Sequence, residues 1–306
     1  MQTALVIEQL LNGIQFGVML FLMAAGLTLI FGVMGLINLA HGSLYMVGAF
    51  ACAAVAAATG SFWLGLAASL AAAAAAGAIV EMTVIRRLYE RDHLDQVLAT
   101  FALILIFSEG TRWLFGSFPL YLNIPAVLQG AVALPGGTHY PLYRLAIIGV
   151  GLGVALGLYL LIGKTRLGMR IRAGESDREM IGALGVDIST LYTVVFALGA
   201  ALAGLAGAMV GALQSVEVGM GEPVLILAFV VIVIGGIGSI KGAFVGALLV
   251  GITDTMGRFL LPGMLAALIG PAKASGVGAA LASMLIYIVM ALILAFRPKG
   301  LFAAQG

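Results

Sequence analysis

Ionisable residues within the apolar stretches of this chain occur mostly as opposite charges about one helical turn apart. Glu109 precedes Arg112 by three residues, and Asp254 precedes Arg258 by four. On a helix these spacings put both side chains of a pair on one face, where they neutralise each other and lower the cost of placing charge in lipid. Both arginines also lie near the ends of their apolar stretches and can extend toward water. We therefore expect both pairs to support the structure rather than to bind substrate.

Glu81 lies close to Arg86 and Arg87 at the end of another apolar stretch, and we interpret it in the same way. A proton-driven transporter would need a series of carboxylates or histidines across the membrane. The apolar stretches contain no such series, so the sequence gives little support to proton coupling. It also lacks the acid, metal or nucleophile constellation that a membrane-embedded enzyme would need.

Two short motifs resemble catalytic sites without completing them. Gly157 to Thr165 reads GLYLLIGKT and nearly matches the phosphate-binding loop GxxxxGK[ST], but it has one residue too many between its glycines and lies at the end of an apolar stretch. Asp92 and Asp95 resemble half of an aspartate-rich magnesium site, which would need a second acidic cluster. Cys52 is the sole cysteine, which excludes a disulfide framework. We expect no nucleotide, cofactor or metal site on this chain.

The composition is that of a membrane protein with many spans. Hydrophobic residues make up 62% of the 306 residues and charged residues 9%, and the mean hydropathy is +1.17. The 43 glycines suit helices that pack closely in lipid. A net charge of +2 is too small to suggest nucleic-acid binding. No polar region is long enough for a soluble domain, so we expect residues 1–306 to form one all-α transmembrane bundle.

The apolar runs predict about nine membrane spans, within a range of eight to ten, because a helical span needs about 20 residues. The runs are continuous rather than alternating, which argues against a β-barrel. The passage FGVMGLINLAHGS between the first two runs is only weakly polar, so it could be a loop in water or a break within the membrane. The predicted spans lie near 8–31, 36–58, 62–85, 96–116, 144–163, 191–213, 223–240, 242–261 and 277–296.

The basic residues predict the orientation of these spans. The loops after the third, fifth, seventh and ninth spans fall on one side and hold 11 of the 15 Lys and Arg residues. Because cytoplasmic loops carry the excess of Lys and Arg, this side is predicted to be cytoplasmic. The N-terminus is then outside and the C-terminus is inside the cell.

Glycine and polar residues interrupt the apolar pattern at Phe31–Ser43 and again at Ile234–Gly246. Such breaks are tolerated where they face protein or a water-filled cavity, and in transporters they often mark the solute pathway. The alternative is that the polar side chains only satisfy backbone groups at a helix break, and the residues do not decide between the two. The two passages could also form a weak internal repeat. The candidate pathway residues are Asn38, His41, Gly42, Ser43, Gly235, Gly236 and Gly238.

The longest polar passage runs from Lys164 to Thr190 and contains a short helix signal. Ser176 and Glu179 have the spacing of a capping box, and Gly185 is placed to end the helix. Met180, Ile181 and Leu184 are predicted to form one apolar face. A helix of about two turns is not stable alone in water, so it must pack on this chain or on a separate soluble protein.

Several passages resemble the smaller permease subunit of bacterial branched-chain amino acid ABC transporters. They are LNGIQFGVMLFLMAAGLTLIFGVMGLINLAHGSLYMVGAF, RIRAGESDREMIGALGVDISTLYTVVFALGAALAGLAGAM, VIVIGGIGSIKGAFVGALLVGI and the closing RPKGLF. The similarity extends over nearly the whole chain. It implies an importer in the inner membrane with a second, related permease subunit, two cytoplasmic ATPases that bind ATP, and an external solute-binding protein.

The resemblance also implies that the 164–190 loop holds a coupling helix that docks on an ATPase. The residues implied are Gly174, Glu175, Ser176, Asp177, Glu179, Met180, Ile181, Leu184 and Gly185. Relatives in this family carry urea, short amides or other amino acids, and the sequence does not separate these substrates. A stand-alone channel or an ion-coupled carrier for small polar solutes is the alternative function, which transport without any ATPase would reveal.

Overall fold

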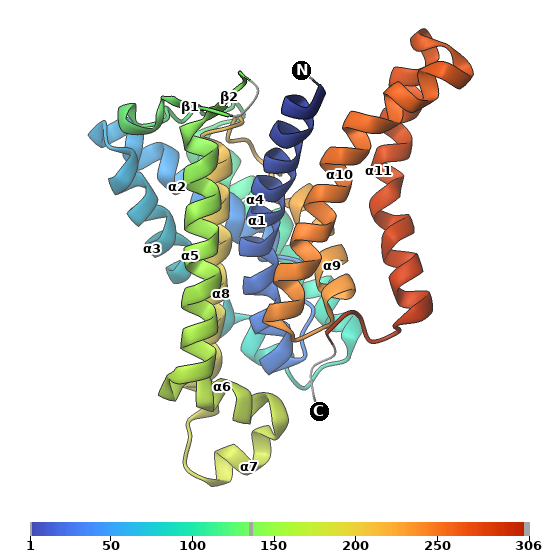
Figure 1. Ribbon diagram of the computed structural model, residues 1–306. Helices are drawn as coiled ribbons and strands as arrows, with labels where there is room; N and C mark the ends of the chain where they lie inside the picture. The colour runs from blue at the N-terminus through green and yellow to red at the C-terminus, as the bar shows by residue number, and fades with distance from the viewer. Residues whose placement is uncertain (1, 135–136, 303–306) are drawn as a thin grey trace.

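Helices account for nearly all of the regular structure in the computed structural model, which describes residues 2–134 and 137–302. Within these residues, eight helices are long and apolar enough to cross a membrane, which confirms the all-α, multi-span prediction (Figure 1). These helices are α1 (Gln2–Met34), α2 (His41–Thr59), α3 (Phe62–Thr83), α4 (His93–Phe115), α5 (Leu142–Lys164), α8 (Ile188–Gly211), α10 (Ile240–Ile269) and α11 (Pro271–Phe296).

The seventh predicted span is shorter than expected. The helix in this region, α9 (Gly221–Gly235), has 15 residues and a length of about 22 Å, less than the hydrocarbon thickness of about 30 Å. The prediction of a full span near 223–240 is therefore wrong. Gly236 and Gly238 have φ angles of 103° and 82°, so the chain turns away from the helix before residue 240.

The passage between α1 and α2 is a break inside the bundle rather than a loop in water. Gly35 leaves α1 with a φ of +64°, and α2 begins only at His41. Leu36, Asn38 and His41 are fully buried. A second break, 212–220, separates α8 from α9.

The starts of α2 and α9 meet at Gly42 and Gly221. A Cβ built on Gly221 would overlap the carbonyl group of Gly42, so the two backbones touch. Helix α2 ends at Gly60, and Ser61 caps the next helix, α3. In the same way α9 ends at Gly236, and Ser239 caps α10.

The same order of elements thus occurs twice, in α1–α3 and in α8–α10: a long helix, a break, a shorter helix and a helix capped by serine. The second half runs in the opposite direction, because α2 and α9 leave their contact toward opposite ends of the bundle (Figure 1). The fold therefore contains an internal repeat in the order of its elements, but not the one expected from the sequence. Its second break is 212–220, and not Ile234–Gly246 as the sequence suggested, because the latter is only the tight turn into α10.

The two ends of the bundle differ in structure (Figure 1). The N-terminus lies at one end with the hairpin of β1 (Ala131–Ala133) and β2 (His139–Pro141), whose strands pair antiparallel. The short helices α6 (Arg166–Ser176) and α7 (Arg178–Ala183) lie at the other end, toward which the chain also returns after α11. Two single 3₁₀ turns, η1 (Ile85–Leu88) and η2 (Ala126–Leu128), complete the elements.

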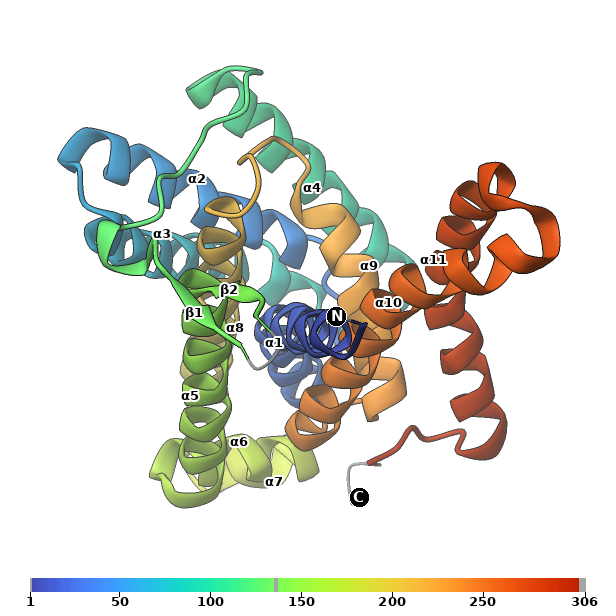
Figure 2. The same cartoon turned by 45° about the horizontal axis from the view of Figure 1, so that its top comes forward.

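The core of the bundle is formed by α1 and α8, which cross at Gly26 and Gly199. A Cβ on either glycine would press on the carbonyl oxygen of the other, so the helices approach to backbone contact. By contrast α4, α5 and α11 are mostly exposed and carry large apolar side chains on their outer faces. Such faces belong against lipid or against another subunit. Figure 2 shows α4 and α11 at the periphery, on either side of α9 and α10.

Candidate functional site

The helix α7 at one end of the bundle begins one residue later than predicted. Asp177, and not Ser176, is its N-cap: the Asp177 carboxylate accepts hydrogen bonds from the backbone amides of Glu179 at 3.0 Å and Met180 at 2.9 Å. The predicted capping box of Ser176 and Glu179 is wrong because α6 extends through Ser176 and leaves Asp177 as the first extended residue. Helix α7 is thus fixed at its start by a charged cap.

The end of α7 is as predicted. Gly185 has a φ of +85°, its amide donates to Gly182 at 3.0 Å, and the Val186 amide donates to Ile181 at 3.3 Å. These two bonds are the Schellman motif, which glycine supports because it adopts the left-handed conformation without strain. A six-residue helix with both ends closed in this way has a defined position at the end of the bundle.

The apolar residues of α7 do not share one face. Met180 is 60% exposed and Leu184 76% exposed, whereas Ile181 is only 6% exposed. The prediction that all three face the same way is wrong because Ile181 lies about 100° around the helix from Met180. Ile181 therefore holds α7 against the chain, and the pair Met180 and Leu184, four residues apart, forms the outward apolar surface.

Helix α6, which the sequence analysis did not predict, positions α7. Thr165 caps it by accepting a hydrogen bond from the Gly168 amide at 3.1 Å. A Cβ on Gly168 would overlap the carbonyl oxygen of Leu161, so the sharp turn between α5 and α6 needs glycine here. Ile171 and Gly174 are buried on the next turns. The signals in the sequence were Thr165 as a cap and the three-residue spacing of Gly168, Ile171 and Gly174.

Helix α8 starts three residues after Gly185 and is joined to α3 by a buried carboxylate. Thr193 on α8 donates to Glu81 at 2.6 Å, Tyr89 donates to it at 2.8 Å, and Arg86 pairs with it at 3.0 Å. Glu81 is fully buried, so its charge depends on these partners. The expected pairing of Glu81 with Arg86 is confirmed.

The N-cap of α8 is Asp187, which accepts from the amides of Ser189 at 3.0 Å and Thr190 at 3.3 Å. The Thr190 hydroxyl also donates to this carboxylate, and this bond together with the backbone bonds lowers the pKa of Asp187 below its usual value. A charged cap at this position favours the helix start, since it faces the positive end of the helix dipole. The connection from α7 to α8 therefore has a fixed geometry.

The other two ion pairs expected within the apolar stretches are present. Arg258 pairs with Asp254 at 2.9 Å and donates to Ser283 on α11 at 3.3 Å, so this pair also joins α10 to α11. Arg112 pairs with Glu109 on an exposed part of α4.

The candidate pathway residues near the first break are buried in the bundle. The Asn38 carboxamide oxygen accepts from the Ala40 amide at 3.0 Å, which is the backbone-satisfying role considered from the sequence. His41 is fully buried with neither ring nitrogen hydrogen-bonded to the described residues. Gly42 touches Gly221, and Ser43 is buried nearby.

The second group of candidates lies at the turn between α9 and α10. Gly235 packs against Gly242, and Gly236 packs against the backbone of Lys299 and Phe302, with no room for a Cβ at either. These contacts are sufficient reason for glycine at 235 and 236. Gly238 instead lies in the wall of a cavity.

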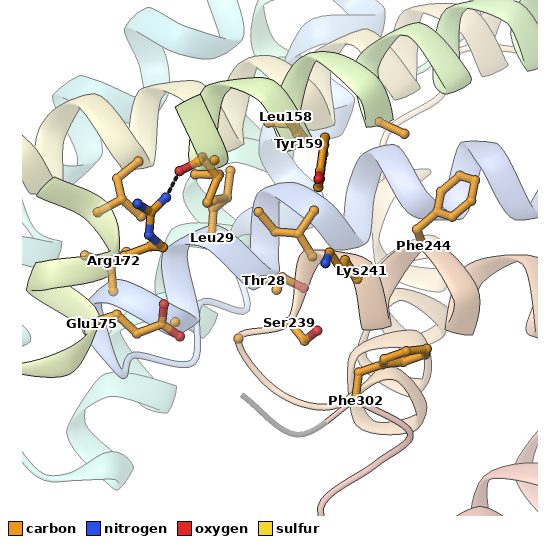
Figure 3. A pocket seen from close by; sticks show the side chains of 18 of the residues that line it. Thr28, Leu29, Leu158, Tyr159, Arg172, Glu175, Ser239, Lys241, Phe244 and Phe302 are labelled. Atoms are coloured by element: carbon orange, nitrogen blue, oxygen red, sulfur yellow. Dashed lines mark hydrogen bonds between the residues drawn. The ribbon is translucent and has the colours of Figure 1, made fainter. Parts of the chain in front are cut away.

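This cavity of about 1050 Å³ lies between α1, α5, α6, the first turn of α10 and Phe302 (Figure 3). Glu175 and Ser176 on α6, both expected to contact an ATPase, line it together with Arg172. Burial raises the pKa of the Glu175 carboxyl above its usual value. The cavity is therefore polar at the α6 end.

Among the described residues, no three metal-ligating side chains lie close enough together to hold a metal ion.

Comparison with known families identifies the chain. The profile of a family described as "Branched-chain amino acid transport system / permease component" matches residues 9–294. The chain belongs to this permease family. It is thus a multi-span membrane protein of a transport family.

Individual members of the permease family agree with this assignment. The chain is 31% identical to the high-affinity branched-chain amino acid transport system permease protein BraD of Pseudomonas aeruginosa, over 82% of this chain and 86% of BraD. It is 28% identical to the corresponding LivH of Escherichia coli, over 82% and 85%. The ribose import permease protein RbsC of Escherichia coli is 27% identical, over 80% and 76%. No solved structure matches the chain.

Proposed function

We propose that this chain is the permease subunit of an ATP-driven importer for branched-chain or related amino acids. Family membership supports transport, and the names of BraD and LivH support this substrate class. Residues 1–306 would act as one transmembrane unit that forms half of the pore. The loop 164–190 would be its cytoplasmic coupling loop.

The observation that carries this proposal is the construction of α7. Two large apolar side chains, Met180 and Leu184, are exposed on a short helix with capped ends, beyond the apolar length of the bundle. A soluble protein exposes such a pair mainly where a partner covers it. The buried Ile181, the Asp187 cap and the Glu81 network connect α7 to α8 and α3, so a push on α7 would reach the spans as a rigid movement.

The partners follow from this arrangement. Two cytoplasmic ATPases would bind ATP and contact the α7 helices of this chain and of a second permease subunit, and an external solute-binding protein would deliver the amino acid. This chain would carry out no chemistry of its own. Its N-terminus would lie outside the cell and its C-terminus in the cytoplasm, as its basic residues indicate.

Reconstitution into proteoliposomes tests the proposal. Vesicles that hold this chain with its second permease, the ATPases, the binding protein and ATP should accumulate a radiolabelled branched-chain amino acid. Vesicles that lack only the ATPases should not. Accumulation without the ATPases would favour the ion-coupled carrier and would contradict the proposal.

A further inference from the structure

The cavity beside α1 has two chemically different parts. Phe21, Leu158 and Phe244 form an apolar part, in which the rings of Phe21 and Phe244 pack edge to face with centroids 5.1 Å apart. Arg172 and Lys241 contribute two cations to the polar part. Figure 3 shows these two side chains approaching the cavity from α6 and α10, with Thr28 of α1 between them.

Neither cation has a carboxylate partner among the described residues. The Arg172 guanidinium donates to the carbonyl oxygen of Ile162, and the Lys241 ammonium lies 5.6 Å from the ring centroid of Tyr159. The three ion pairs within the described part of the chain involve other arginines. Both cations are exposed and therefore free to bind an anion. The start of α10 adds positive potential through its helix dipole.

The surroundings of the cavity indicate which kind of anion it would bind. Its α5 wall includes Tyr159, and next to it Leu156 and Leu160 are exposed on the outer face of the helix. These side chains belong against lipid or another subunit, so an acyl chain on this face would find the apolar surroundings that it needs. The polar part lies at the α6 end, where the bundle reaches the membrane surface. A soluble anion would leave Tyr159 and Val245 of the lining, which are 54% and 39% exposed, without contact.

We infer that this cavity binds one anionic phospholipid, with the phosphate between Arg172 and Lys241 and the first part of the acyl chains against Tyr159, Phe244 and Val245. Basic pockets between transmembrane helices bind anionic head groups in this way. Glu175 is the one carboxylate that lines the cavity among the described residues. The lipid would connect α6 to the start of α10.

Lipid titration of the purified full-length chain by native mass spectrometry tests this inference. Phosphatidylglycerol and phosphatidylcholine with identical acyl chains are the two probes. The wild type should bind one phosphatidylglycerol in preference to phosphatidylcholine. The double variant Arg172→Gln/Lys241→Gln should lose about tenfold or more of this preference. The reason is that each basic residue near an anionic lipid surface raises the affinity for the lipid about fivefold.

The matched control is Lys164→Gln/Arg170→Gln, which removes two exposed charges from the same end of the bundle outside the cavity. It should keep the preference, as should the charge-preserving Arg172→Lys/Lys241→Arg. Equal losses in the two Gln double variants, or displacement of the lipid by inorganic phosphate at the same concentration, would overturn the inference.

A second measurement needs no variant. Phosphatidylglycerol with a photoactivatable diazirine near its carbonyl group should label the wild-type chain on peptides that contain Tyr159 or Phe244. Labelling confined to the outer faces of α4 and α11 would contradict the proposed site even if every Gln variant failed to fold.

Discussion

The Thr193 hydroxyl donates a hydrogen bond of 2.6 Å to the buried carboxylate of Glu81 and thereby joins α8 to α3. Thr193 lies on the second turn after the α7–α8 connection, so Glu81 is the point at which a movement of α7 would enter the bundle. Arg86 donates to both residues, at 3.0 Å to Glu81 and at 2.8 Å to Thr193. The three side chains form one network.

Glu81→Gln should lower stability by about 1–3 kcal/mol, because it removes charge-assisted hydrogen bonds but leaves Arg86 free to contact water. Arg86→Gln should be more harmful, since it leaves a buried carboxylate without its cation. Thermal unfolding in detergent would measure both. The double variant should be more stable than Arg86→Gln alone; if the two single effects simply add, the network does not exist as described.

Gly185→Ala should loosen the end of α7. The left-handed conformation at φ +85° costs an alanine about 1–2 kcal/mol, which the two hydrogen bonds of the Schellman motif would have to offset. Hydrogen exchange of the Val186 amide should become faster.

The control for this change is Gly182→Ala. A Cβ at Gly182 meets only the Ile188 side chain at 3.7 Å, an ordinary contact, and alanine favours the helix. Faster exchange at Val186 in this control, or unchanged exchange in Gly185→Ala, would argue against a fixed helix end.

Gly221→Ala should prevent α2 and α9 from meeting, because the added Cβ would overlap the backbone of Gly42. Overpacking of backbone against backbone cannot be relieved by a rotamer change, so we expect a loss of about 3 kcal/mol or more and poor yield of folded protein. Gly153→Ala is the comparison, since a Cβ there meets nothing within 4 Å. Normal stability of Gly221→Ala by size-exclusion and thermal assays would show that the two helices do not touch.

Single cysteines at Asn38, His41 and Ser43, in a chain whose Cys52 is replaced by Ala, should react slowly with a membrane-impermeant thiol reagent. All three positions are buried in this conformation. If His41 lies on the solute pathway, its labelling should rise when the complete importer turns over. Unchanged protection during transport would leave only the structural role, and a cysteine at the exposed Tyr121 would report full labelling throughout.

The sequence predicted those features that depend on local chemistry. Gly185 ends α7 because a left-handed residue is needed there, and the acid–base pairs formed because their spacing places them on one helix face. The sequence did not predict the N-cap of α7, since Ser176 and Asp177 are both good caps and the choice depends on where α6 ends. It also placed Ile181 outward, because a six-residue helix is too short to show its buried face from periodicity.

The second break was missed for a different reason. The apolar run of α8 continues to Leu213, and the predicted spans 191–213 and 223–240 leave the residues between them outside the membrane. Only the contact of Gly221 with Gly42, 179 positions apart in the sequence and therefore invisible to local pattern, places the start of α9 inside the bundle. The cavity likewise combines residues from α1, α5, α6 and α10 that no sequence spacing connects.

The most direct test of the central claim, that force reaches this chain through α7, is copurification of the ATPases with Met180→Glu/Leu184→Glu. Charges on the exposed apolar pair should leave folding intact and reduce bound ATPase at least about tenfold, since burying an unpaired carboxylate in an interface costs several kcal/mol. The control is Phe118→Glu/Tyr121→Glu, which adds the same charges to exposed aromatic residues between α4 and α5. This control variant should copurify with as much ATPase as the wild-type chain does. If the Met180 and Leu184 variant retained the ATPases as well, α7 would not be the coupling helix.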